Sequence, residues 1–220
     1  MPHLWNEYFV KEKYKFVAGS ETPLIIDAGA HIGLSVLYWK SLFPKARIIA
    51  FEPDPANFAA LKANCADLSG VELHNAAVWC YAGDAAFTQV GSVGGFLSTL
   101  AADGSDPQLH VRTVSLRDFL QEPVDLLKLD IEGAEIDVLL YCADRLENVE
   151  QLFVEYHSFI DRPQRLSAML ALLEQAGFRL HAHSELPAAQ PFVHRPVVNH
   201  KDFRLNVFAF RGDAFGEQCV

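Results

Sequence analysis

The chain has few cysteines and no long apolar run. Its cysteines form no C-x-x-C pair and have no histidine at a metal-ligand spacing; they are Cys65, Cys80, Cys142 and Cys219. This pattern predicts reduced thiols in a cytoplasmic protein. No apolar run reaches the roughly 18 residues of a membrane-spanning helix. The first residues lack the basic segment and apolar core of a secretion signal.

Basic residues are also scarce. The chain has 18 lysines and arginines against 28 aspartates and glutamates, which gives a formal net charge of −10. The densest basic cluster is "KEKYK" at residues 11–15. Proteins that bind nucleic acid need basic surfaces to neutralise phosphates. We therefore expect neither nucleic acid nor a membrane as a partner.

What the sequence does contain is an alternation of short apolar runs with helical patterns. A chain of 220 residues, half of them apolar, suits one well-packed domain. Continuous apolar runs are typical of parallel strands that are covered on both faces; they lie at 24–29, 47–54, 71–79, 124–130 and 150–157. Helical spacing between them predicts an α/β fold with a doubly wound, mostly parallel sheet.

The alternation breaks in two places within this single domain, 1–220. Residues 80–116 read as short β segments joined by glycine-rich turns, and we interpret them as a β insertion. The final strands are expected at 178–183 and 204–210, and the proline-containing stretch 184–203 between them is predicted to be a loop. Residues 1–22 are expected to form an N-terminal helical extension.

Polar residues stand where the predicted strands end. Asp27, Glu52 and Asp130 end three runs, and Glu155 and His157 end a fourth. Ligands of open α/β sheets bind outside the carboxyl ends of the strands. A helix N-cap explains a single aspartate equally well, but this repeated pattern favours a functional rim.

The stretch "DAGAHIG" at 27–33 indicates the kind of ligand. Gly29 permits a tight turn, and Gly33 permits close packing of the next helix. The spacing G-x-x-x-G differs from the dinucleotide fingerprint G-x-G-x-x-G. Asp27 would repel phosphates but attract an ammonium group, and Glu52 can accept both hydroxyls of a ribose. These features favour S-adenosylmethionine over a nicotinamide dinucleotide.

Several of these stretches together resemble the FkbM family of S-adenosylmethionine-dependent methyltransferases. The similarity covers about residues 22–178, and its most specific element is "KLDIEGAE"; the others are "IIDAGAHIGLS", "IIAFEPDPANFAAL", "NAAV" and "LFVEYH". The resemblance implies a class I methyltransferase fold, Rossmann-like, with seven strands and the last antiparallel. It also implies O-methylation of a hydroxyl on a small molecule, sugar, natural product or glycan.

The resemblance places the cofactor against the glycine loop and the end of the second strand. It implies that Asp27, Gly29 and Glu52 hold the cofactor, with Pro53 beside the adenine and Ala77 near it. The full set of predicted cofactor-binding residues is Asp27, Gly29, Ala30, His31, Gly33, Glu52, Pro53, Ala77 and Asp130.

The remaining rim residues are catalytic candidates. Lys128 and Asp130 share a strand face, so Lys128 can neutralise Asp130 or another carboxylate at a strand end, in a structural or a catalytic role. His157 is the predicted general base, because its ordinary pKa of about 6.5 lies near neutral pH. Glu155 or Asp130 would orient it or the acceptor. For Glu135, a favourable interaction with a helix dipole is the simplest interpretation.

Two further questions stay open at this point. Asp130, Glu155 and His157 offer ligands for Mg²⁺ or Mn²⁺, but their spacing is no recognised metal motif and a solvated cleft explains them equally well. A non-catalytic S-adenosylmethionine-binding module and, less favoured, a nicotinamide-dependent oxidoreductase remain alternatives to the methyltransferase.

Overall fold

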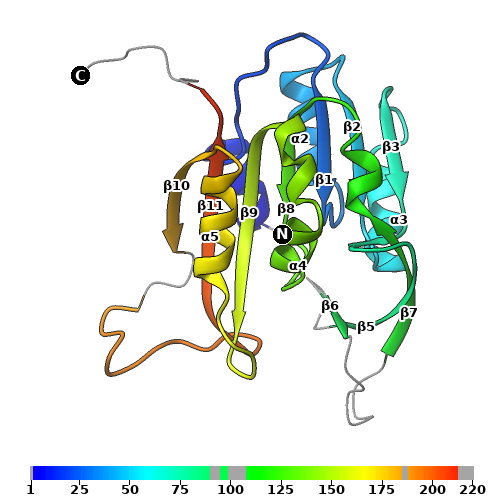
Figure 1. The fold of residues 1–220 in the computed structure, drawn as a ribbon. Helices are drawn as coiled ribbons and strands as arrows, with labels where there is room; N and C mark the ends of the chain where they lie inside the picture. Colours follow the sequence, from blue (N-terminus) through cyan, green and yellow to red (C-terminus); the bar gives the residue numbers. More distant parts are fainter. Residues whose placement is uncertain (1, 90–94, 99–107, 185–187, 213–220) are drawn as a thin grey trace.

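The computed structural model describes residues 2–89, 95–98, 108–184 and 188–212. A seven-stranded sheet forms the centre of the molecule, in the order β10-β11-β9-β8-β1-β2-β3 (Figure 1). Its strands are β1 (Leu24–Ala28), β2 (Arg47–Phe51), β3 (Val71–His74), β8 (Val124–Leu129), β9 (Val149–Phe159), β10 (Arg179–Ser184) and β11 (Lys201–Phe210).

The strand directions are those of a class I methyltransferase sheet. The pairs β1·β2, β1·β8, β2·β3 and β8·β9 are parallel. The last strand, β11, runs antiparallel to both β9 and β10. The predicted fold class, including the antiparallel last strand, is therefore confirmed.

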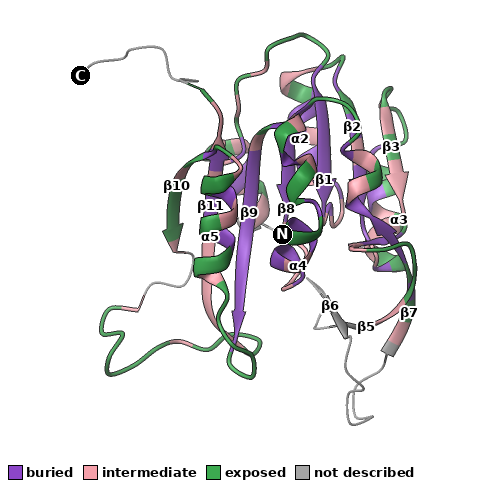
Figure 2. Cartoon of the chain, in the orientation of Figure 1, coloured by how far each residue is buried: buried purple, intermediate pink, exposed green. Residues whose placement is uncertain are grey.

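Helices cover both faces of the sheet. One face packs against α2 (Leu34–Leu42) and α3 (Pro55–Asn64), and the other against α4 (Glu135–Tyr141) and α5 (Leu166–Gln175). The 3₁₀ segments η2 (Leu116–Phe119) and η3 (Ala143–Asn148) add to the second layer. This double cover explains why the central strands are apolar throughout, and Figure 2 shows β8 and β9 almost wholly buried.

The local signals for α3 work as expected. Asp54 caps the helix, because its Oδ1 accepts hydrogen bonds from the backbone amides of Ala56 and Asn57 at 2.8 and 2.9 Å. Pro55 occupies the first helical position, where the lack of an N–H costs nothing. The β2–α3 connection is thereby fixed, and Glu52 with it.

The apolar run 71–79 is two strands and not one. β3 belongs to the central sheet, whereas β4 (Ala77–Trp79) joins a second sheet of order β4-β7-β5-β6. Asn75 lies at the break and donates hydrogen bonds from Nδ2 to the carbonyls of Glu52 and Pro53, at 2.8 and 3.1 Å. These bonds turn the chain away from the central sheet. The other strands of the second sheet are β5 (Gly83–Gln89), β6 (Gly95–Ser98) and β7 (Gln108–Ser115), all within the predicted β insertion.

The ends of the chain depart from simple expectation. The N-terminal segment is helical only in α1 (Pro2–Trp5) and the π-helical turn η1 (Asn6–Val10), and residues 11–23 contain no helix or strand. Within 184–203, the described part makes two isolated β-bridges, and β11 already begins at Lys201. None of the helices in the described ranges reaches the length and apolar character that crossing a membrane requires.

The described cysteines are unpaired. Cys65, Cys80 and Cys142 are free thiols, as the sequence predicts, and Cys65 and Cys142 are buried. Cys219 lies outside the described residues.

Candidate functional site

The glycine loop after β1 lies directly against the turn after β8. Gly29 has φ +93°, and a Cβ at this position would fall 1.9 Å from the carbonyl oxygen of Asp130. Only glycine permits this approach. The amides of Gly29 and Ala30 both donate to the carbonyl of Phe51, at 3.1 and 2.9 Å. The loop therefore connects the carboxyl ends of β1, β2 and β8 at one rim of the sheet.

Glu52 holds the next part of the loop. Its Oε2 accepts the amide of His31 at 2.8 Å, and its Oε1 accepts the amide of Asp54 at 2.9 Å. Burial raises the pKa of Glu52 to about 7, although these amide hydrogen bonds act to lower it. Each carboxylate oxygen has a second acceptor site, so Glu52 can still accept hydroxyl groups of a ligand.

Asp27 and Lys128 form a buried ion pair beneath the rim. The Nζ of Lys128 lies 3.1 Å from Oδ1 of Asp27, and the two side chains are 1% and 0% exposed. Lys128 also donates to the carbonyl of Gly29 at 2.9 Å and lies 3.7 Å from Asp130. Oδ2 of Asp27 accepts the hydroxyl of Ser35. The ion pairing predicted for Lys128 is therefore present.

This arrangement gives Asp27 a different immediate partner from the one the sequence suggests. Both of its oxygens are bonded within the protein, to Lys128 and Ser35. The carboxylate that reaches the rim is that of Asp130, whose side chain is 26% exposed. Burial acts to raise the pKa of Asp130, but the charges of Lys128 and His157 outweigh it and lower that pKa. Asp130 is therefore ionised at neutral pH.

Glu135 does more than the predicted interaction with a helix dipole. Its carboxylate accepts the amides of Ile131 and Gly133 at 3.0–3.2 Å, which fixes the turn after β8. The same Oε1 lies 2.9 Å from Nδ1 of His157, and both side chains are 1% exposed. Glu135 thus joins the first turn of α4 to the end of β9 and sets the orientation of the imidazole.

His157 lies among carboxylates. Its Nε2 is 3.6 Å from Glu155 and 3.8 Å from Glu132. Burial acts to lower the pKa of His157, but Glu135 and the other carboxylates outweigh it and raise the pKa to about 9. The ring is therefore protonated at neutral pH. A histidine that is already protonated cannot accept a proton, so the predicted role of His157 as general base does not fit a pKa of about 9.

Glu155 is the group of this cluster whose pKa lies near neutral pH. Burial and the nearby charge of Asp130 raise its pKa to about 7, although His157, Lys13 and Arg204 act to lower it. Arg204 on β11 lies 3.3 Å away. Glu155 is therefore about half ionised at neutral pH, which suits a group that takes up a proton.

The three candidate metal ligands do come together. One ligand atom from each of Asp130, Glu155 and His157 lies within 4.8 Å of the others. Both carboxylates already have cationic neighbours, Lys128 for Asp130 and Arg204 for Glu155. The distances would suit a cation, but the charges are largely balanced without one.

The N-terminal segment supplies a wall of the site that the sequence analysis missed. Tyr8 is buried, and the charges of Lys128, Asp27 and Asp130 act on its hydroxyl, whose pKa burial raises. Tyr8 stacks on Tyr14 at 4.7 Å between ring centroids. In the sequence Tyr8 and Tyr14 belong to a stretch of aromatic and basic residues that contains no recognisable motif.

The other predicted cofactor residues belong to the loop itself or to the segments that follow β2 and β3. Ala30 is buried, and His31 has φ 51° where the loop turns. Pro53 is held through its carbonyl by Asn75, which the sequence analysis did not single out. Ala77 is buried on β4, in the second sheet. Gly33 starts α2 with φ +88°, where a Cβ would lie 2.7 Å from Leu61.

A seven-stranded sheet with an antiparallel last strand, and a glycine loop at the carboxyl end of β1, define a class I methyltransferase fold. The sequence model of the methyltransferase FkbM domain matches residues 27–180. The chain belongs to this family and is a methyltransferase.

Individual relatives agree with this assignment. The methyltransferase sdnD of Sordaria araneosa is 31% identical, and the alignment covers 80% of this chain and 81% of sdnD. The 2-O-methyltransferase NoeI of Sinorhizobium fredii is 27% identical over 61% of this chain and 63% of its own length. The crystal structure of an FkbM methyltransferase from Methylobacillus flagellatus superposes with a TM-score of 0.58 at 15% identity. It aligns with 92% of this chain, which spans 47% of that longer protein.

The buried pair yields a stability prediction. Lys128→Met should lower the free energy of unfolding by about 3–5 kcal/mol, because it leaves Asp27 buried without a counter-ion. The double variant Asp27→Asn/Lys128→Met should recover part of this loss, since no charge is then left unpaired. Urea denaturation followed by circular dichroism measures both.

The matched control is Lys62→Met on α3, where the lysine is exposed. Its effect should stay within about 0.5 kcal/mol. An equally small loss in Lys128→Met would contradict the importance of the pair.

Proposed function

We propose that this protein is an S-adenosylmethionine-dependent O-methyltransferase that acts on a hydroxyl of a small-molecule, sugar, natural-product or glycan acceptor. The observation that supports this most is one shared rim. The glycine loop, Glu52 and the Asp130–Glu155–His157 cluster all lie at the carboxyl ends of adjacent strands. The name of the relative NoeI, a 2-O-methyltransferase, supports the choice of oxygen.

The residues present fit the cofactor. Gly29 packs against the carbonyl of Asp130, which brings the loop after β1 and the turn after β8 together at the rim where the cofactor would lie. Glu52 would accept the ribose hydroxyls, and the ionised Asp130 would accept the ammonium group. Asp27 would act through Lys128, which it holds against the carbonyl of Gly29. When bound, S-adenosylmethionine supplies a methyl group on a positively charged sulfur.

Glu155 is the residue that we propose as proton acceptor. In the reaction the acceptor oxygen would take the methyl group as that group leaves the sulfur of the cofactor, and the oxygen would lose its proton. The hydroxyl proton passes to Glu155, whose pKa of about 7 allows it to accept a proton at neutral pH.

His157 takes a complementary role in this proposal. Glu135 fixes its Nδ1, and its protonated Nε2 faces the same space as Glu155. From there the imidazolium can donate to the acceptor oxygen as that oxygen loses its proton. This division modifies the sequence-based choice of His157 as base while keeping it at the reacting oxygen.

We propose that the reaction needs no metal ion. Lys128, which Asp130 shares with Asp27, and Arg204 already lie beside the two carboxylates, and the protonated His157 adds a further positive charge to the cluster. A divalent ion would have to displace this proton. A required Mg²⁺ or Mn²⁺ ion is therefore the less favoured alternative.

Cofactor binding is the first prediction of this proposal. Isothermal titration calorimetry should show one site for S-adenosylhomocysteine, and Glu52→Ala should weaken it by about 1–3 kcal/mol, the usual loss for a charged hydrogen-bond partner. Glu72→Ala, an exposed carboxylate on β3, is the control and should bind normally. NAD should give no saturable signal. Equal affinity in wild type and Glu52→Ala would argue against the site, and saturable NAD binding would favour the oxidoreductase alternative.

The second prediction concerns pH. Because Glu155 must be ionised, the rate should fall as the pH drops through about 7. Because His157 must be protonated, the rate should also fall as the pH rises through about 9. An acceptor found by screening hydroxylated metabolites for release of S-adenosylhomocysteine allows the profile to be measured.

Two variants separate these limbs. Glu155→Gln should cut turnover by about 10²–10⁴-fold, and His157→Ala should remove the alkaline limb while cofactor affinity stays intact. The exposed Glu150→Gln on β9 should match wild type. Retention of full turnover in Glu155→Gln would return the role of base to His157 or Asp130.

The third prediction tests the metal. Activity should persist after exhaustive treatment with EDTA and gel filtration, because the cluster is charge-balanced by side chains. Loss of activity that Mg²⁺ or Mn²⁺ restores would show that the ion is required.

A further inference from the structure

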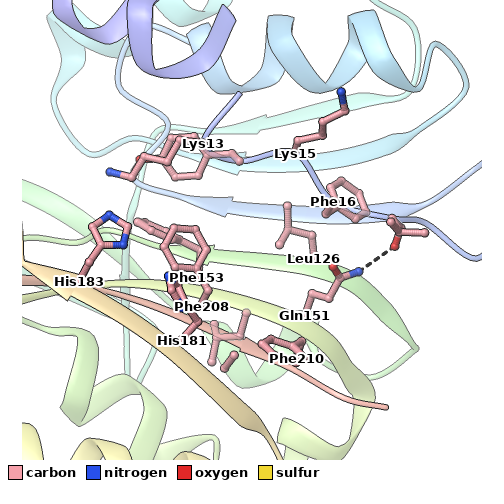
Figure 3. Close-up of a pocket in the computed structure, with 14 residues that line it drawn as sticks. Lys13, Lys15, Phe16, Leu126, Gln151, Phe153, His181, His183, Phe208 and Phe210 are labelled. Atoms are coloured by element: carbon pink, nitrogen blue, oxygen red, sulfur yellow. Dashed lines mark hydrogen bonds between the residues drawn. The ribbon is translucent and has the colours of Figure 1, made fainter. Parts of the chain in front are cut away.

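A cavity of about 700 Å³ lies between the N-terminal segment and the sheet. Figure 3 shows Lys13, Lys15 and Phe16 on one side of it, with side chains from β8, β9, β10 and β11 on the other. Neither the cofactor site nor the reaction proposed above uses this space. Its volume is that of pockets that bind small molecules.

The floor of the cavity belongs to the same sheet face as the reaction site. Lys128, Phe153, Phe208 and His181 form one row across four paired strands. The next row toward the rim contains Glu155, Asn206 and His183. The same face of β9 therefore carries Phe153 of the cavity and then Glu155, so the cavity ends next to the proposed proton acceptor.

The lining is apolar with a basic edge. Aromatic rings of Phe153 and Phe208 pack at 5.1 Å between centroids, and His183 stacks on Phe208 at 5.6 Å. Among the 14 described residues that line the cavity, none is acidic, whereas two lysines and two histidines are present. In a chain with net charge −10, this composition favours an apolar ligand that carries a negative charge.

Lys13 connects the cavity to the reaction site. Its Nζ lies 5.4 Å from the ring centre of Phe153 and 3.6 Å from Glu7. Its charge also acts to lower the pKa values of Asp130 and Glu155. An anionic group held by Lys13 would therefore sit close to the atom that is methylated.

Most of the wall lies outside the part of the chain that matches the family. The matched residues are 27–180, while the wall includes 13–17, His181, His183 and Phe208–Phe210. The cofactor loop and the reaction cluster, by contrast, lie within the matched part. Most of the cavity wall is therefore outside what the family model describes.

We infer that this cavity binds the apolar, non-reacting part of the acceptor, and that the acceptor carries an anionic group that pairs with Lys13. The acceptor class is then an apolar hydroxy acid and not a neutral sugar. The identification of the ligand as the acceptor rests on the proposed function, whereas binding in the cavity does not.

Two fluorescent probes test the binding. The anion 8-anilinonaphthalene-1-sulfonate and its uncharged counterpart N-phenyl-1-naphthylamine should each bind the folded protein at one site. Gln151→Trp puts a bulkier side chain into the cavity, where it obstructs a ligand, and should weaken both by about tenfold or more. Lys13→Gln should weaken only the anion, by about fivefold, because it removes one charge.

The controls exclude non-specific effects. Lys45 is an exposed lysine that does not line the cavity, so Lys45→Gln should leave both affinities unchanged. Near-ultraviolet circular dichroism shows whether each variant is folded. If a variant does not fold, His181→Glu replaces it, because His181 is exposed and the substitution adds a negative charge at the edge of the cavity. Binding that neither Gln151→Trp nor His181→Glu weakens would overturn the site. Dimerisation that Gln151→Trp abolishes, without probe binding, would assign the face to a second copy of the chain.

The acceptor class is tested by transfer of label from S-adenosyl[methyl-¹⁴C]methionine to 3-hydroxydecanoate or to methyl α-glucopyranoside. Wild type should label the hydroxy acid faster, and Gln151→Trp should lose this preference. Equal labelling of the two compounds, including none in either, would overturn the assignment of the acceptor while the probe result stands. A wild-type protein that does not bind S-adenosylhomocysteine would instead count against the proposed function.

Discussion

The buried pair of Asp27 and Lys128 is the interaction on which the rim depends. It joins β1 to β8 at the point where both strands end, and it also fixes the carbonyl of Gly29. An isolated charge at either position would be strongly unfavourable, so each residue requires the other. Because the pair is completely enclosed, Asp130 is left as the carboxylate that is exposed at the rim. One internal contact thus decides which acid is buried and which is accessible.

A second set of contacts sets the pKa values in the cluster of Asp130, Glu155 and His157. Glu135 reaches both the turn after β8 and the ring of His157, so the backbone and the imidazole are fixed by one carboxylate. Crowding of acids raises the pKa of the histidine, and burial raises that of Glu155. His157 still has a higher pKa than Glu155, as a free histidine has compared with a free glutamate. Both pKa values are raised, and that of Glu155 comes to lie near neutral pH. Burial and the like charge of Asp130 explain the raised pKa of Glu155, whereas the opposite charges of the carboxylates explain the raised pKa of His157 against the effect of burial.

The sequence predicts the fold well because its signals are local. Apolar runs mark the strands, Asp54 and Pro55 mark the start of α3, and the spacing of Lys128 and Asp130 places them on one face. The break at Asn75 could not be read from the apolar pattern, since it depends on carbonyls 22 and 23 positions earlier in the chain.

The candidate site is predictable only in part, because some of its features follow from local sequence patterns and others from contacts between distant segments. Strand ends can be located from local patterns, so the acidic rim was expected. Which acid pairs with which base is set by contacts across the sheet, and the pKa of His157 follows from three carboxylates on two other segments and its own strand. Tyr8 and Lys13 belong to no repeating pattern, and only the folded chain brings them to the site.

The parallel pair of β4 and β7 has a consequence for how this family can vary. Ala77–Trp79 pairs with Thr113–Ser115, so the long excursion between them leaves and returns at one place. Thr113 closes this base through a hydrogen bond to the carbonyl of Tyr81 at 3.0 Å. Lengthening a closed loop costs only about 0.6 kcal/mol for each doubling. The excursion can therefore gain or lose residues over evolution while the central sheet and its rim keep their geometry.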